Sequence, residues 1–161
     1  DMVTGYLGIR GGSGLPRYFM YEEWQSRMGK SLWEAKDKYL ASSAIVEADK
    51  IHTPLLIWHN DKDEAVAYEQ GRALYLAMRR LQRPAWHLNY KGEGHFLGNQ
   101  AAQKDWTIRM KQFFDYYLKG TKEPRWMKEG IHLRERGIDV PDSYLTTEGM
   151  VDWLWQSIST K

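Results

Sequence analysis

The sequence predicts an α/β fold with a parallel sheet, and three observations carry that prediction. An uninterrupted apolar run at residues 55–58 suits a strand that is buried on both faces. Apolar residues then recur at helical spacing over residues 67–82, before a second strand-like run at 85–90. A long amphipathic pattern over residues 101–119 follows. Strand, helix, strand, helix is the alternation of a parallel sheet with flanking helices.

The first fifty residues predict loops and short helices. Glycines are dense over residues 5–17 and Pro16 lies near the end of this stretch, which indicates a loop. Helix-forming residues over 19–39 are interrupted at residues 29–31. Ser31 and Glu34 have the spacing of a capping box, which predicts a helix that begins there and continues to Leu40. One further turn is expected within residues 44–51.

The later elements have clear boundaries up to residue 120. Pro54 opens the first strand, Pro84 marks the turn before the second, and Gly120 ends the long helix. The apolar face of that helix is expected to consist of Trp106, Met110, Phe113, Phe114 and Tyr117. Residues 123–127 are predicted to be a surface excursion, and residues 146–158 a short terminal helix. We expect two parts, residues 1–130 as one α/β region and residues 131–161 as a C-terminal extension.

Two strands make an incomplete sheet, because one face and both edges stay open. The strong local pattern and the small number of strands together predict that this chain is the C-terminal portion of a larger α/β domain whose N-terminal half is missing. The same exposed edges predict that the isolated chain forms a homo-oligomer.

Composition excludes several classes of function. The chain has 161 residues, a formal net charge of +2 and no cysteine, so disulfides, thiol catalysis and cysteine-ligated metals are ruled out. No basic stripe indicates nucleic acid, and no apolar run approaches the roughly 20 residues that span a membrane. We therefore expect neither nucleic-acid nor membrane partners, and no cofactor or metal.

Two loops that follow the strands carry the candidate chemistry. Asp61 and Asp63 follow the first strand, and His95 follows the second in a Gly-x-Gly-His sequence. Functional loops of open α/β sheets lie beyond the carboxyl ends of strands, and an α/β-hydrolase delivers its acid and then its histidine in this order. A solvated acidic turn, or a metal site formed by Asp61, Asp63 and Glu64, is the alternative for the first loop. His59, His87 and His132 lack the glycine-flanked context of His95.

No serine has the context of a nucleophile. Ser13 lies in Gly-Gly-Ser-Gly-Leu, where Leu15 replaces the last glycine of a G-x-S-x-G elbow. Pro16 and Arg17 come next instead of a helix, although an elbow needs a strand before it and a helix directly after it. The loop interpretation is therefore favoured over a small esterase that uses Ser13.

Residues 48–120, with GIRGGSGLPRYFMYEEWQSRMGKSLWE upstream and PRWMKEG downstream, resemble the C-terminal end of the prolyl oligopeptidase family of serine peptidases. The resemblance implies the C-terminal portion of an α/β-hydrolase fold and the hydrolysis of peptides. The family's catalytic aspartate matches Asp63, with Asp61 as the neighbouring alternative, and its catalytic histidine matches His95. Val66 matches a position near the substrate's specificity pocket. Ala65 stands where prolyl endopeptidases have an arginine, which favours an exopeptidase-like or broader relative.

The resemblance implies that this chain supplies the acid and the base of a Ser-Asp-His triad but lacks the serine. We therefore expect the isolated chain to be inactive, with peptide substrate bound only together with the missing half. The alternative function is that of a non-catalytic fragment that self-associates through dimerisation or domain swapping.

Overall fold

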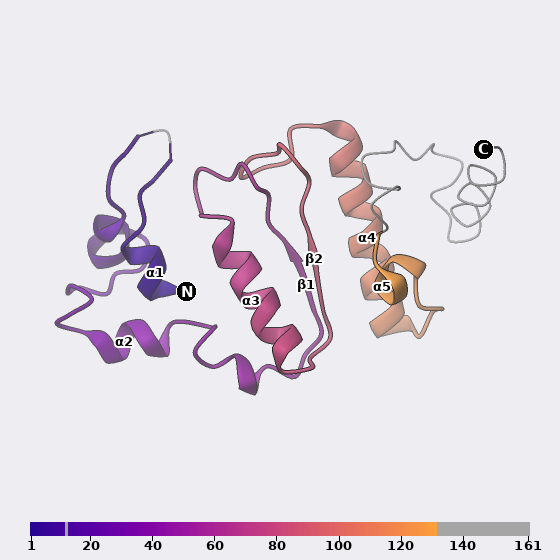
Figure 1. Cartoon of the computed structure of the whole chain (residues 1–161), viewed down its shortest axis with the longest axis horizontal. Coiled ribbons are helices and arrows are strands. Elements are labelled where there is room, and N and C mark those ends of the chain that lie inside the picture. Colours follow the sequence, from indigo (N-terminus) through magenta and orange to yellow (C-terminus); the bar gives the residue numbers. More distant parts are fainter. Residues whose placement is uncertain (12, 132–161) are drawn as a thin grey trace. The chain divides into compact units, whose positions relative to one another are not determined.

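The computed structural model describes residues 1–11 and 13–131 (Figure 1). The chain divides into two compact units, and the boundary in the sequence lies between Asn99 and Gln100. The first unit contains the sheet. Its elements, in chain order, are α1 (Met2–Tyr6), the π-helical turn η1 (Met20–Trp24), α2 (Lys36–Ala41), the 3₁₀ turn η2 (Ala48–Lys50), β1 (Leu55–Trp58), α3 (Glu69–Arg80) and β2 (Ala85–Leu88). The described part of the second unit contains α4 (Gln100–Lys119) and α5 (Arg125–Glu129).

The two strands are parallel neighbours, as the sequence predicted. The register pairs Leu55 with Ala85 and Trp58 with Leu88, so both strands end at the same edge of the sheet. Helix α3 connects them and contacts both, with Met78 fully buried (Figure 1). This crossover brings the loop after β1 and the loop after β2 side by side. The fold is the C-terminal portion of an α/β-hydrolase fold, with an incomplete sheet among the described residues.

The N-terminal segment has a small aromatic core of its own, formed by Tyr6, Leu32 and Tyr39. The rings of Tyr6 and Tyr39 meet edge to face with centroids 5.3 Å apart. The buried Ser43 hydroxyl accepts a hydrogen bond from the backbone N–H of Met2 and donates one to the carbonyl of Tyr39, which fixes α1 against α2. These contacts order a segment in which the sequence showed little periodicity.

Two predictions for this segment were wrong at the helix boundaries. The predicted loop began at Gly5, but Gly5 and Tyr6 belong to α1, because the Asp1 carboxylate accepts a hydrogen bond from the Val3 N–H and caps the helix. Ser31 and Glu34 do bond as a capping box, but they close an isolated turn, and α2 begins only at Lys36. A local capping signal does not determine whether the chain continues as a helix beyond its first turn.

The second unit confirms the long helix but corrects the prediction for residues 123–127. Helix α4 ends at Lys119, and Gly120 adopts φ +65°, a conformation that favours glycine. On the predicted apolar face Phe113 is buried, but Phe114 is 50% exposed. The predicted surface excursion is the helix α5, in which Trp126 is buried and donates its indole N–H to the Gln112 side chain at 2.8 Å.

The predicted helix over 146–158 lies outside the described residues. Within the described part of the chain, no helix combines the length and apolar character that crossing a membrane requires.

Candidate active site

The site lies at the carboxyl edge of the two strands, in the loops that follow β1 and β2. Asn60 is 1% exposed and connects the two loops. Its amide N–H₂ donates to the Gly94 carbonyl at 2.8 Å, and its oxygen accepts from the Tyr90 backbone N–H at 3.1 Å. The same oxygen accepts from the Trp58 indole at the end of β1. The amide group thus fixes the turn that carries His95 relative to the end of the first strand.

Asp63 is held by backbone groups of its own loop. Its Oδ1 accepts hydrogen bonds from the N–H groups of Ala65 and Val66, both at 2.8 Å. The side chain is only 5% exposed. Two backbone donors thus hold Oδ1, and Oδ2 is left for contacts with other side chains.

His95 contacts that second oxygen. Its Nδ1 lies 2.9 Å from Asp63 Oδ2, while 45% of the histidine side chain is exposed. An ionised carboxylate only accepts, so Nδ1 carries the proton and Nε2 presents a lone pair. The sequence placed both residues at this edge, and the structure brings them into hydrogen-bonding contact.

Burial of the Asp63 carboxyl acts to raise its pKa. The hydrogen bonds from the Val66 N–H, from His95 and from the Ala65 N–H outweigh that effect, so the pKa of Asp63 lies below its ordinary value. The carboxylate therefore stays ionised beside His95.

His59 is the residue that the sequence missed. Its Nε2 lies 3.2 Å from Asp63 Oδ2, the oxygen that His95 contacts, and 3.1 Å from the Val66 carbonyl. Its Nδ1 accepts a hydrogen bond from the Gly71 N–H near the start of α3. The signal in the sequence was its place as the first residue after β1, but the partner at residue 71 belongs to another element.

Asp61 has a different partner from Asp63. Its carboxylate accepts a hydrogen bond from the Gly92 N–H at 2.8 Å, and its own N–H donates to the Asn89 side chain. Gly92 has φ +83°, so this turn requires glycine. Of the two candidate acids, Asp63 contacts His95, whereas Asp61 bonds to Gly92 in the turn that precedes His95.

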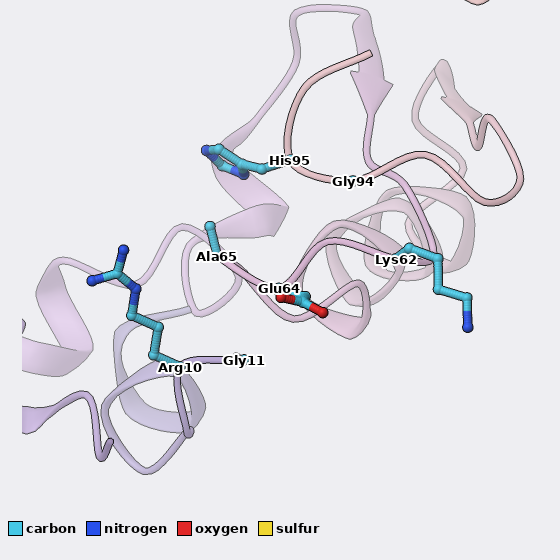
Figure 2. A pocket seen from close by; sticks show the side chains of 7 residues that line it. All are labelled: Arg10, Gly11, Lys62, Glu64, Ala65, Gly94 and His95. Atoms are coloured by element: carbon cyan, nitrogen blue, oxygen red, sulfur yellow. The ribbon is translucent and has the colours of Figure 1, made fainter. Parts of the chain in front are cut away.

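A pocket of about 320 Å³ opens beside His95 (Figure 2). Its lining residues are Arg10, Gly11, Lys62, Glu64, Ala65, Gly94 and His95. Figure 2 shows the Arg10 guanidinium and the His95 ring on the same side of the loop, while the Lys62 side chain extends in the opposite direction. The Gly11 N–H donates to the Glu64 carbonyl, and a Cβ at residue 11 would lie 2.7 Å from the Glu64 Cβ. Only glycine lets the two loops approach this closely.

The remaining sequence candidates lie elsewhere. Val66 holds Asp63 with its N–H and His59 with its carbonyl, and it is not among the lining residues of this pocket. The Ser13 hydroxyl bonds within its own loop, donating to the Arg10 carbonyl and accepting from the Leu15 N–H. His87 stacks on Tyr68 with ring centroids 5.4 Å apart, and burial lowers its pKa. His132 lies outside the described residues.

Over the part of the chain that the structure describes, no group of three histidine or acidic side chains could hold a metal ion. The polar groups of the site instead bond to one another and to the backbone, around a single buried carboxylate.

The fold is that of an α/β protein. Its aspartate and histidine contact each other at the carboxyl edge of parallel strands, as the acid and histidine of an α/β-hydrolase do. A family model described as the prolyl oligopeptidase family matches residues 13–121, so the chain belongs to the prolyl oligopeptidase family.

Two relatives illustrate the match. Probable dipeptidyl-peptidase 5 of Aspergillus clavatus is 30% identical over 102 residues, which cover 62% of this chain and 14% of that protein. Dipeptidyl aminopeptidase BIII of Pseudoxanthomonas mexicana is 28% identical over 115 residues, covering 70% of this chain and 17% of that protein. The chain thus spans less than a fifth of the length of either relative.

The C-terminal residues match a different family. A model described as the energy-coupling factor transporter EcfA1 C-terminal domain matches residues 130–161. The energy-coupling factor transporter ATP-binding protein EcfA1 of Enterococcus faecalis is 61% identical over 31 residues, which cover 19% of this chain and 11% of that protein. The two family matches share no residue.

Proposed function

We propose that residues 1–130 supply the general base and the orienting acid of a serine peptidase, with His95 as the base and Asp63 as the acid. One observation carries the proposal: Asp63 Oδ2 lies 2.9 Å from His95 Nδ1 while two backbone N–H groups hold Oδ1. This arrangement fixes the histidine tautomer that has an unprotonated Nε2. The serine nucleophile comes from a part of the catalytic domain outside this chain. Residues 131–161 form a separate extension.

The mechanism is built on that geometry. His95 Nε2 removes the proton of the serine hydroxyl as the oxygen attacks the peptide carbonyl, and the imidazolium then returns the proton to the leaving amine. A water molecule repeats the sequence on the acyl-enzyme, which releases the acid product and regenerates the serine. Asp63 stays ionised throughout and stabilises the imidazolium through Nδ1.

The substrate is a peptide, and the pocket beside His95 receives part of it. Ala65 faces this pocket and carries no charge that could hold a substrate carbonyl. We therefore propose an exopeptidase-like or broad specificity, in keeping with the names of the Aspergillus clavatus and Pseudoxanthomonas mexicana relatives. The Val66 side chain borders the bound peptide in this proposal.

The experiment uses a fluorophosphonate probe, which labels activated serines. The purified chain is expected to show no labelling, because Ser13 bonds only within its loop in the described structure. Labelling that is lost in Ser13→Ala would overturn the proposal.

A chimera tests the two assigned residues. Residues 13–121 replace the matching region of the Pseudoxanthomonas mexicana aminopeptidase, which supplies the rest of the catalytic domain. Peptidase activity should be lost in His95→Ala and in Asp63→Asn, and kept in the matched control Asp61→Asn, whose amide oxygen can still accept from the Gly92 N–H. Equal loss with Asp61→Asn and Asp63→Asn would contradict the choice of acid.

Exposed apolar side chains support a second proposal, that the isolated chain self-associates. Within the first unit Leu7, Ile9, Leu15 and Phe96 are each more than 60% exposed. Apolar side chains that are exposed in one copy lose contact with water when a second copy covers them, which favours association. Light scattering over a range of concentrations should show a mass above the monomer's 19.0 kDa, and a monomer at every concentration would contradict this proposal.

A further inference from the structure

His59 is fixed in one orientation by contacts at both ring nitrogens. Nδ1 accepts from the Gly71 N–H at 3.1 Å, and Nε2 lies 3.1 Å from the Val66 carbonyl. Its side chain is 10% exposed. A ring nitrogen that accepts from an N–H carries no proton, so the single proton of the neutral ring lies on Nε2. His59 is therefore a neutral donor at Nε2.

That donor reaches the acid of the proposed triad. Nε2 lies 3.2 Å from Asp63 Oδ2, on which His95 Nδ1 also converges at 2.9 Å. His95 Nδ1–H therefore donates to Oδ2, two backbone N–H groups hold Oδ1, and His59 Nε2 lies between Oδ2 and the Val66 carbonyl, to which it is hydrogen-bonded. Two histidines, His59 and His95, thus lie within 4.0 Å of this carboxylate.

The first turn of helix α3 fixes the orientation of the His59 ring. The Gly71 N–H lies in the first turn, where helix N–H groups lack partners within the helix. A Cβ at residue 71 would lie 2.5 Å from His59 Nδ1, so the contact exists only because residue 71 is glycine. The backbone of α3 thereby determines which nitrogen of His59 faces Asp63.

We propose that His59 is a positioning residue: its Nε2–H, shared between the Val66 carbonyl and Asp63 Oδ2, holds that oxygen toward His95, while the start of α3 fixes its tautomer through Gly71. This inference rests on the proposed function, because it acts through the Asp63–His95 pair. His59 itself touches no substrate.

Two substitutions separate the roles of the two ring nitrogens. His59→Asn places its side-chain oxygen near the position of Nδ1, so it can still accept from Gly71 but has no donor for Asp63. His59→Gln places its amide N–H₂ near the position of Nε2, so it keeps the donor and loses the Gly71 contact. A role limited to capping α3 would favour the first variant, and the proposed role favours the second.

The test is nuclear magnetic resonance of the whole chain with labelled histidine and aspartate. In the unmodified protein, nitrogen shifts at a pH where both rings are neutral should show His59 protonated at Nε2 and His95 protonated at Nδ1. Carboxyl carbon titration should show an upward shift of the Asp63 midpoint in His59→Asn and little shift in His59→Gln.

The outcomes separate a failure of this inference from a failure of the proposed function on which it rests. A proton on His59 Nδ1 in the unmodified protein overturns the inference even if both variants fail to fold. An Asp63 midpoint that is unchanged in His59→Asn, or equally raised in both variants, also overturns it. If His95 lacks a proton on Nδ1, the proposed Asp63–His95 pair itself is wrong.

Discussion

Replacing Gly71 with alanine should destabilise the protein, although a glycine-to-alanine change in a helix usually does the opposite. The added methyl carbon would lie 2.5 Å from His59 Nδ1 and 2.8 Å from His59 Cβ. These distances are shorter than real carbon contacts, so either the ring or the first turn of α3 must move. A displaced ring also loses the 3.1 Å hydrogen bond from the Gly71 N–H.

Three effects determine how much Gly71→Ala changes the free energy of unfolding. Overpacking a well-packed site costs about 1–3 kcal/mol. The lost hydrogen bond costs roughly 1 kcal/mol. Alanine's better helix propensity returns about 0.5–1 kcal/mol. The expected net loss in the free energy of unfolding is about 2 kcal/mol, which corresponds to a roughly 30-fold change in the ratio of folded to unfolded protein.

Urea unfolding followed by tryptophan fluorescence measures this change, and a double-mutant cycle identifies its origin. In a His59→Ala background the methyl group meets the residue 59 Cβ but no ring, so Gly71→Ala should cost less than it does in the unmodified protein. A neutral or stabilising Gly71→Ala, or an equal cost in both backgrounds, would refute the contact between α3 and His59.

Two further predictions concern Asn60, which connects the two loops, and Asp63, whose pKa is lowered. Asn60→Ala removes three hydrogen bonds of a buried side chain and should lower the free energy of unfolding by roughly 3 kcal/mol. The control Asn89→Ala, at an exposed residue, should change the free energy of unfolding by less than about 1 kcal/mol. Urea unfolding measures both changes, and similar losses in the two variants would contradict the prediction. The folded-state pKa of Asp63 is lowered, so its contribution to stability is present above the ordinary carboxyl pKa and is lost as the pH falls through the folded value. The difference in free energy of unfolding between the unmodified protein and Asp63→Asn should therefore shrink as the pH falls. Unfolding measured at several acidic pH values checks this, and a difference that does not change with pH would show that Asp63 behaves as an ordinary exposed carboxylate.

The local signals determined most of the sheet region. The apolar run at residues 55–58 is strand β1 as predicted, and Gly120 ends α4. The helix predicted over 67–82 is α3 at Glu69–Arg80, shorter by two residues at each end, and Gln82 has a non-helical φ of +56°. Such features depend on periodicity, proline and glycine, which act over a few residues and need no distant partner.

Features that depend on distant partners were missed. Helix α5 was predicted as a surface excursion, yet Trp126 is buried and bonds to Gln112 of the preceding helix. The composition of a five-residue helix carries too little signal to reveal such packing. In the same way α1 depends on Asp1 and on the contact of Met2 with the distant Ser43.

The sequence by itself determined the class of the site: two loops after two parallel strands, one acidic and one with a glycine-flanked histidine. Only the tertiary structure shows that the carboxylate facing His95 is that of Asp63, whereas the carboxylate of Asp61 accepts from Gly92. It also shows the contacts of His59, one of which comes from the Gly71 N–H of another element. Periodicity reports which face of an element is buried, whereas the orientation of a side chain is set by hydrogen bonds between segments far apart in the chain.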